Sequence, residues 1–124
     1  LMEYLTLTDI YFFTSKDPYQ AVSGTFLYAM SAGCPVISNS FVLAKEMLDE
    51  ETGIILETAG ETELAEKAIM LLQNDDLRKK MSNSALLKMR DTNWKKVGRK
   101  HADLFYEIFG KPVASNKLSN QVAG

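Results

Sequence analysis

The residues of this chain that could do chemistry gather in one stretch, Gln20–Ser38. A glutamine opens it, the turn Ser23-Gly24-Thr25 follows, and a helical pattern then runs to a stop at Gly33. The first N–H groups of a helix have no partner within the helix, and the helix dipole places partial positive charge at that end. The two hydroxyls add donors, and the glycine lets a ligand approach closely. The turn therefore predicts a site for an anion, phosphate above all.

The elements that must hold this turn alternate between strand and helix. Apolar runs of strand length occur at Ile10–Phe13, Pro35–Ser38 and Gly53–Leu56, and helical patterns lie between them, the second over Phe41–Leu48. Alternation at this spacing predicts parallel β-α-β units with right-handed crossovers. We expect an α/β fold, a three-layer Rossmann-like parallel sheet that is partial at about three strands and is followed by C-terminal helices. Ile10–Phe13 is the expected central strand, and ligands bind at the carboxyl end of such a strand, beside the turn.

Two helices are expected after Leu56. Apolar residues share one face over Leu64–Leu72, and they recur at four-residue steps over Leu77–Met89. Asn74 or Asp75 is the expected N-cap of the second helix, because short polar side chains accept hydrogen bonds from the free N–H groups of a first turn.

A last helix is expected between an Asn93 cap and Gly110. Residues 111–124 are polar, and we expect a disordered or loosely docked tail there, after a single domain of residues 1–110. The apolar stripe of the helix, which we interpret as core with His101 packed in it or at its rim, consists of Trp94, Val97, His101, Leu104, Phe105 and Ile108.

Composition limits the class of protein. The 124 residues suit one domain or a piece of one, and the start resembles the end of a helix, so we expect a fragment of a longer protein. The net charge of −2 argues against nucleic acid or an anionic membrane as the main partner, and no apolar run reaches the roughly 20 residues of a membrane span. Cys34, the single cysteine, fits a reducing cytosol and cannot form an internal disulfide. We expect a soluble cytoplasmic domain that binds no metal and keeps Cys34 buried and inert.

Several motifs resemble one enzyme family. Tyr28–Ser38 (Tyr-Ala-Met-Ser-Ala-Gly-Cys-Pro-Val-Ile-Ser) is similar to the Glu-Ala-Met-Ala-x-Gly-x-Pro-Val-Ile segment of group 1 glycosyltransferases, which have the two-domain GT-B fold. The similarity extends over roughly residues 3 to 109, where the order and spacing of the motifs agree as well. The further motifs are Glu51–Ile55, Leu64–Ile69, Asp75–Arg78 and Asn93-Trp94. The chain thus resembles the second half of the C-terminal, donor-binding domain of such an enzyme.

The resemblance assigns donor-binding roles. Two glutamates eight positions apart usually contact the nucleotide-sugar donor in this family, the first at the sugar hydroxyls and the second at the ribose; the matching positions here are Gln20 and Tyr28. The glutamine amide and the tyrosine phenol can still form hydrogen bonds with hydroxyls. Together with Ser23-Gly24-Thr25 they are the expected donor-binding residues. No catalytic residue, metal ligand or cofactor is assigned, and the nucleoside diphosphate sugar is a substrate.

The resemblance implies transfer of a hexose from a nucleoside diphosphate sugar to an acceptor, with retention at the anomeric carbon and without an obligatory metal. Family members also use a basic Arg and Lys pair earlier in the same domain, and acceptor residues on an N-terminal domain. Neither lies in this chain, so we expect the chain alone to be inactive. Two alternatives stay open: a noncatalytic scaffold that binds a partner, and another enzyme of the same architecture, such as a sugar-nucleotide epimerase or a phosphorylase.

Each candidate also has a plain structural interpretation. Ser23-Gly24-Thr25 can be a helix cap, Gln20 a loop residue, and Tyr28 a half-buried aromatic that packs on the sheet.

The edge of the sheet raises a separate expectation. If Ile10–Phe13 lacks a neighbour on one side, its apolar edge invites pairing with another chain, and we expect self-association there.

Overall fold

The computed structural model describes residues 1–58 and 60–110. The predicted tail, residues 111–124, lies outside the described residues. The chain divides into two compact units, Leu1–Arg90 and Asp91–Gly124.

Three parallel strands form one sheet in the first unit. In the order in which they lie side by side, they are β1 (Tyr11–Phe13), β2 (Val36–Ser38) and β3 (Gly53–Ile55). Each is one residue shorter than predicted, and the expected α/β fold is confirmed. Tyr11 lies opposite Val36, which lies opposite Gly53. A Cβ on Gly53 would lie 2.5 Å from the Val36 carbonyl oxygen, so only glycine lets β3 approach β2 this closely.

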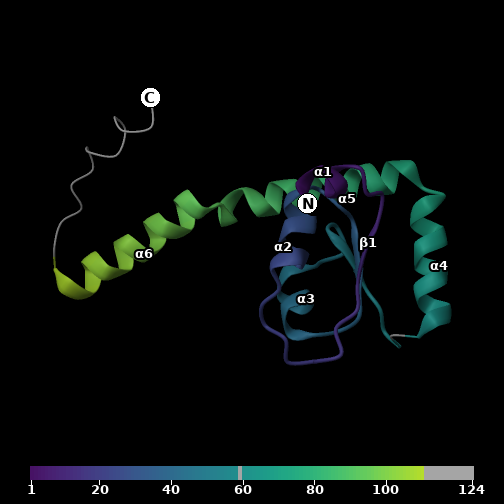
Figure 1. Ribbon diagram of the computed structural model, residues 1–124, viewed down its shortest axis with the longest axis horizontal. Helices are drawn as coiled ribbons and strands as arrows, with labels where there is room; N and C mark the ends of the chain where they lie inside the picture. The colour runs from purple at the N-terminus through teal and green to yellow at the C-terminus, as the bar shows by residue number, and fades with distance from the viewer. Residues whose placement is uncertain (59, 111–124) are drawn as a thin grey trace. The chain divides into compact units, whose positions relative to one another are not determined.

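Helices cover both faces of the sheet (Figure 1). On one face lie α2 (Gly24–Ser31) and α3 (Val42–Met47); on the other lies α4 (Glu61–Leu72). Because side chains alternate along a strand, Val36 packs into the core under α2 and α3, whereas Ile37 packs into the core under α4. The result is the expected three-layer arrangement. Because the strands are parallel, those that are followed by a helix all end at the same edge of the sheet.

The helix boundaries agree with the caps read from the sequence. Gly33, at φ 78°, ends α2 in the left-handed region that favours glycine. Asn74 caps α5 (Asp75–Met89), because its Oδ1 accepts a hydrogen bond from the Leu77 amide at 3.0 Å. A short helix, α1 (Met2–Thr6), opens the chain, and its Leu5 carbonyl accepts from the buried Cys34 thiol at 3.0 Å. Burial raises the pKa of the Cys34 thiol, which keeps it neutral.

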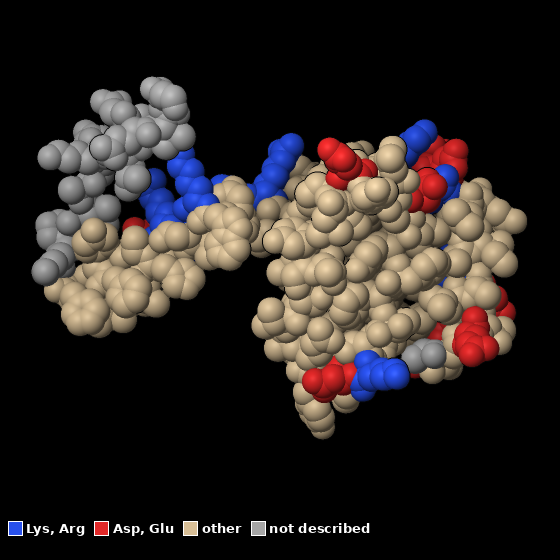
Figure 2. All heavy atoms as spheres, viewed as in Figure 1, with Lys and Arg blue, Asp and Glu red and all other residues tan. Residues whose placement is uncertain are grey.

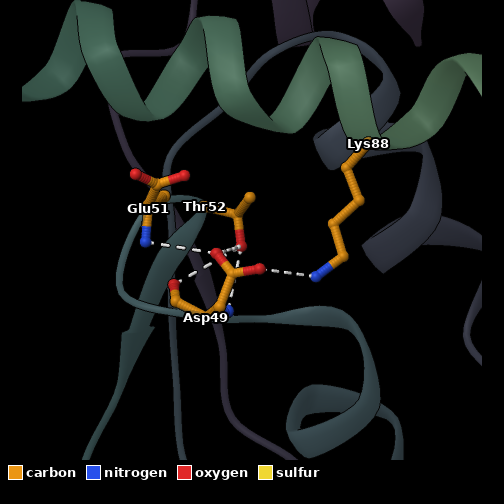
Figure 3. Close-up of polar contacts among 4 residues, drawn as sticks. All are labelled: Asp49, Glu51, Thr52 and Lys88. Carbon is orange, nitrogen blue, oxygen red and sulfur yellow. Dashed lines mark hydrogen bonds and ion pairs between the residues drawn. The ribbon is translucent and has the colours of Figure 1, made fainter.

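The turn between α3 and β3 is held by polar contacts with α5 (Figure 3). Asp49 Oδ1 accepts from the Glu51 amide at 3.1 Å and from the Thr52 hydroxyl at 2.9 Å, and Asp49 Oδ2 accepts from Lys88 Nζ at 2.7 Å. The hydrogen bond from Lys88 is the main reason that the pKa of Asp49 lies below its usual value.

The second unit contains α6 (Trp94–Phe109), which follows a 3-10 turn, η1 (Arg90–Thr92). Asn93 caps α6 as predicted, with Oδ1 2.9 Å from the Lys96 amide nitrogen. Gly110, at φ 65°, ends it as predicted. No described helix is long and apolar enough to cross a membrane.

The prediction that the apolar stripe of α6 is core is wrong for the described residues. No residue of the helix is buried, Trp94 is 87% exposed, and His101 is exposed with its Nδ1 2.9 Å from the Val97 carbonyl oxygen. Figure 2 shows Lys and Arg side chains along one side of α6 and residues without charge along the other. The spacing of apolar residues indicates that a helix has an apolar side, but it does not indicate which part of the protein covers that side.

Candidate functional site

Three aromatic rings fix the ends of the elements that frame the site. Phe13 ends β1, Phe26 lies in the first turn of α2, and Phe41 precedes α3. The Phe13 ring centroid lies 5.4 Å from that of Phe26 and 5.3 Å from that of Phe41, and the last two are 5.8 Å apart. Phe26 and Phe41 are buried. Packing of this kind holds the end of β1 and the starts of both helices in one arrangement.

The turn before α2 has the properties predicted for an anion site. Ser23 is the N-cap, and its Oγ accepts from the Phe26 amide at 3.3 Å. The Gly24 and Thr25 amides have no acceptor among the described residues, and both residues are exposed. A Cβ at Gly24 would meet nothing nearer than a Tyr28 ring carbon at 3.9 Å. Two N–H groups at the positive end of the helix are therefore open to a ligand.

Gln20 and Tyr28 flank this turn in different ways. The Tyr28 ring is half exposed and lies beside Gly24. The Gln20 side chain takes part in bonds within its own loop: its Oε1 accepts from the Ser15 hydroxyl at 2.6 Å, and its Nε2 donates to the Val22 carbonyl at 3.1 Å. One N–H and one lone pair of this amide stay available. Gly24, Thr25 and Tyr28 thus share one surface, Ser23 is the buried cap beside it, and Gln20 is bound into the loop that leads to it.

Sequence reasoning missed the residues that shape this loop, which we call the β1–α2 loop (residues 14–23). Asn39, directly after β2, accepts from the Ser15 amide at 2.8 Å and donates to the Ser15 carbonyl at 2.6 Å. The first amides of α3 bind the loop as well: Val42 N donates to the Pro18 carbonyl at 3.1 Å, and Leu43 N to the Gln20 carbonyl at 3.1 Å. A polar residue directly after a buried strand was the available signal for Asn39.

A cavity in the first unit lies at the other end of the sheet. It has a volume of about 370 Å³ and is lined by residues that precede the strands, such as Asp9 and Pro35, and by Arg78 and Ser82 of α5. Because the strands are parallel, these residues lie at their amino ends, away from the turn at Gly24. This cavity is separate from the candidate site.

Titratable groups do not gather at the site. Among residues 1–58 and 60–110, no three His, Cys, Asp or Glu side chains are placed to hold a metal ion. The donors that the exposed part of the site offers are backbone amides, the Thr25 hydroxyl and a phenol, which are ligands for phosphate and sugar oxygens rather than for a transition metal.

The arrangement defines a class of protein by its fold: a partial Rossmann-like domain in which the helix after the first strand begins with two exposed amides. A solved structure with this fold is sucrose-phosphate synthase from Thermosynechococcus elongatus, which has a TM-score of 0.71 and 18% sequence identity to this chain. The match covers 86% of this chain and 27% of that chain, so the chain spans about a quarter of its solved counterpart. That likeness shows a fold of the GT-B type.

The amino-acid sequence of this fold identifies the family to which the chain belongs. Residues 1–74 match the family described as "Glycosyl transferases group 1", and the chain belongs to that family. The matched region contains the whole sheet, the β1–α2 loop and α2. The resemblance read from the motifs is thereby confirmed. No protein with a curated description matches the chain.

Proposed function

We propose that this chain is part of the donor-binding domain of an enzyme that transfers a hexose from a nucleoside diphosphate sugar to an acceptor, with retention at the anomeric carbon. In this proposal the turn Ser23-Gly24-Thr25 binds the diphosphate, Tyr28 approaches the ribose, and Gln20 approaches the sugar. No metal or other cofactor takes part. The intact enzyme works in the cytoplasm, and this chain alone has no turnover, because its acceptor site and further donor contacts belong to other parts of the enzyme.

The observation that carries the proposal is the pair of exposed amides at Gly24 and Thr25. They have no acceptor among the described residues, and they lie where α2 begins, after the carboxyl end of a parallel strand. Negative charge develops on the leaving diphosphate as the glycosidic bond to it breaks. Fixed N–H dipoles aimed at that charge lower the barrier, because they need no reorganisation during the reaction. The turn supplies this stabilisation without a charged side chain.

The test is titration of UDP and of GDP into the intact protein while the amide resonances of residues 23–25 are followed. We expect saturable shifts at Gly24 and Thr25 with one of the two nucleotides. Gly24→Val should remove these shifts, because its side chain fills the space through which a diphosphate reaches the amides. Gly98→Val is the matched control: Gly98 is also exposed and helical with open space around it, and this variant should bind as the parent does.

A noncatalytic scaffold is the second candidate, and one observation favours it. Both positions at which the family has glutamate are neutral here, and Gln20 already forms two hydrogen bonds within its loop. A scaffold that needs no donor would retain the fold and lose the acids. If neither nucleotide shifts residues 23–25, the scaffold is supported and donor binding is excluded for these two nucleotides.

A further inference from the structure

We propose that Asn39 is a positioning residue of the donor site: it fixes the β1–α2 loop so that Gln20 and the turn Ser23-Gly24-Thr25 face one ligand. This inference deepens the proposed function and rests on it. Asn39 belongs to the connection between β2 and α3, which contains none of the donor-binding residues assigned above. It acts through the backbone of Ser15 rather than by touching a ligand.

The side chain of Asn39 takes the place of a neighbouring strand. β1 ends at Phe13 and β2 at Ser38, so the backbone ladder between them stops there. Two residues further along the first connection, the Ser15 amide donates to Asn39 Oδ1 at 2.8 Å, and Asn39 Nδ2 donates to the Ser15 carbonyl at 2.6 Å. A side-chain amide thus offers the donor and the acceptor that a strand residue would offer. The β1–α2 loop and the connection from β2 to α3 can therefore diverge while Ser15 stays bonded to Asn39, the residue that follows β2.

Further hydrogen bonds join Ser15 to Gln20 and hold Gln20 in place. The Ser15 hydroxyl lies 2.6 Å from Gln20 Oε1, and the Gln20 carbonyl accepts from the Leu43 amide at 3.1 Å. The loop is therefore held at its start by Asn39 and at Gln20 by the first turn of α3. No side chain caps α3, so loop carbonyls serve its first amides. Asn39 and α3 belong to one continuous segment, and together they set the path that leads to the Ser23 cap.

This arrangement explains why an amide, rather than a carboxylate, suits position 39. Asparagine satisfies both the N–H and the C=O of Ser15, whereas aspartate would place a charged oxygen against that carbonyl. Asn39→Asp keeps the size and one of the two hydrogen bonds, and Asn39→Ala removes both. Ser15→Ala removes the hydroxyl contact with Gln20 and leaves both bonds to Asn39 in place. These three variants test separately the contact between Asn39 and Ser15 and the contact between Ser15 and Gln20.

The experiment uses the intact protein and two readouts. Hydrogen exchange of the amides of residues 15–23 reports the loop without any ligand, and titration with UDP and GDP reports the site. We expect faster exchange in Asn39→Ala and Asn39→Asp, and about tenfold weaker binding of whichever nucleotide the parent binds, as for other residues that orient a ligand-binding group. Asn83→Asp, the same change on an exposed residue of α5, is the matched control and should leave both readouts unchanged.

The outcomes distinguish this inference from the proposed function. Unchanged exchange of residues 15–23 in the Asn39 variants overturns the positioning role, whatever happens to binding. Faster exchange with unchanged nucleotide affinity also overturns it, because the loop would then move without consequence for the site. If the parent binds neither nucleotide, the proposed function fails, and with it the part of the inference that concerns the donor. If Asn39→Ala does not fold, Asn39→Asp supplies the comparison for Asn39, and Ser15→Ala still tests the contact between Ser15 and Gln20.

Discussion

Among single residues, Gly24 and Gln20 differ in how much of their bonding capacity is open to a ligand. The Gly24 amide has no acceptor among the described residues and lies in open space. The Gln20 amide side chain accepts from Ser15 and donates to Val22. In the proposed function, binding of phosphate by the Gly24 amide needs no rearrangement of the loop, whereas a sugar can bind only to the remaining N–H and lone pair of the Gln20 side chain. The two contacts should respond differently to substitution.

We predict that Gln20→Ala weakens binding of a nucleoside diphosphate hexose by about 1–2 kcal/mol, the scale of one good hydrogen bond. Binding of the nucleoside diphosphate alone should weaken less, because in the proposed function Gln20 approaches the sugar rather than the phosphates. Calorimetric titration of both ligands into the intact protein measures the difference. Gln73→Ala, at an exposed glutamine after α4, serves as the control. Equal losses for the two ligands would mean that Gln20 only shapes the loop.

Individual residues also show which features of the site could be predicted from the sequence. The Ser23 cap and the stop at Gly33 were predictable because each depends on local backbone geometry. The role of Asn39 was not, because it depends on a contact with Ser15, 24 positions away, across two strands. The donor roles of Gln20 and Tyr28 stay predictions.

At the scale of elements, α5 is tied to the turn between α3 and β3 by two ion pairs among the described residues, Lys88–Asp49 and Lys80–Glu51, of which the first is the shorter and has supporting hydrogen bonds. Lys88 Nζ lies 2.7 Å from Asp49 Oδ2, and the Asp49 side chain is 52% exposed. An exposed pair contributes little to the free energy of unfolding because water and salt screen it. The hydrogen bonds to Thr52 and Glu51 fix the carboxylate in place, so less entropy is lost when the pair forms.

We predict that Asp49→Asn lowers the free energy of unfolding by about 0.5 to 1 kcal/mol at neutral pH. The pKa of Asp49 is depressed in the folded state, so its contribution is fully present above the unfolded pKa of about 4. As the pH falls below that value and through the folded pKa, the carboxylate is protonated and the difference between parent and variant should vanish. Urea unfolding at a series of pH values measures this difference.

Glu51→Gln is the control for this prediction. Glu51 lies 3.7 Å from Lys80, and both side chains are about two-thirds exposed, so its replacement should have no measurable effect at any pH. A loss for Asp49→Asn that persists at pH 2, or that equals the loss for Glu51→Gln, would show that the ion pair is not its source.

The elements themselves could largely be predicted from the sequence. The three strands and the last five α-helices match the expected order, because alternating apolar runs, caps and glycines act locally. Burial was predictable where a helix lies against the sheet, as for Phe26 and Met30 of α2. It was not predictable for α6, whose apolar side has the same spacing but is exposed in the described residues. Periodicity does not specify the partner of an apolar face.

For the molecule as a whole, the open edge of β1 matters most. Within the described residues β1 pairs with β2 alone. The Tyr11 amide donates to the Pro35 carbonyl at 2.9 Å, so the amides of Tyr11 and Phe13 point toward β2. The N–H and C=O of Phe12, between them, therefore point to the open edge. Its side chain, 49% exposed, adds apolar surface there. We propose that two copies of this chain associate through this edge.

We predict that the chain forms a dimer whose mass in light scattering falls to that of a monomer in Phe12→Pro. Proline removes the outward amide of position 12 while the bonds from β1 to β2 remain, because proline is tolerated where an edge strand faces solvent. Phe12→Val is the matched control: it removes the same aromatic ring but keeps the amide, and its dimer should persist. Phe105→Lys places a charge on the exposed side of α6 and should also leave the dimer intact. A parent chain that is monomeric at high concentration, or a dimer that only Phe105→Lys disrupts, would contradict pairing through β1, since the contact would then be absent or would belong to the helix.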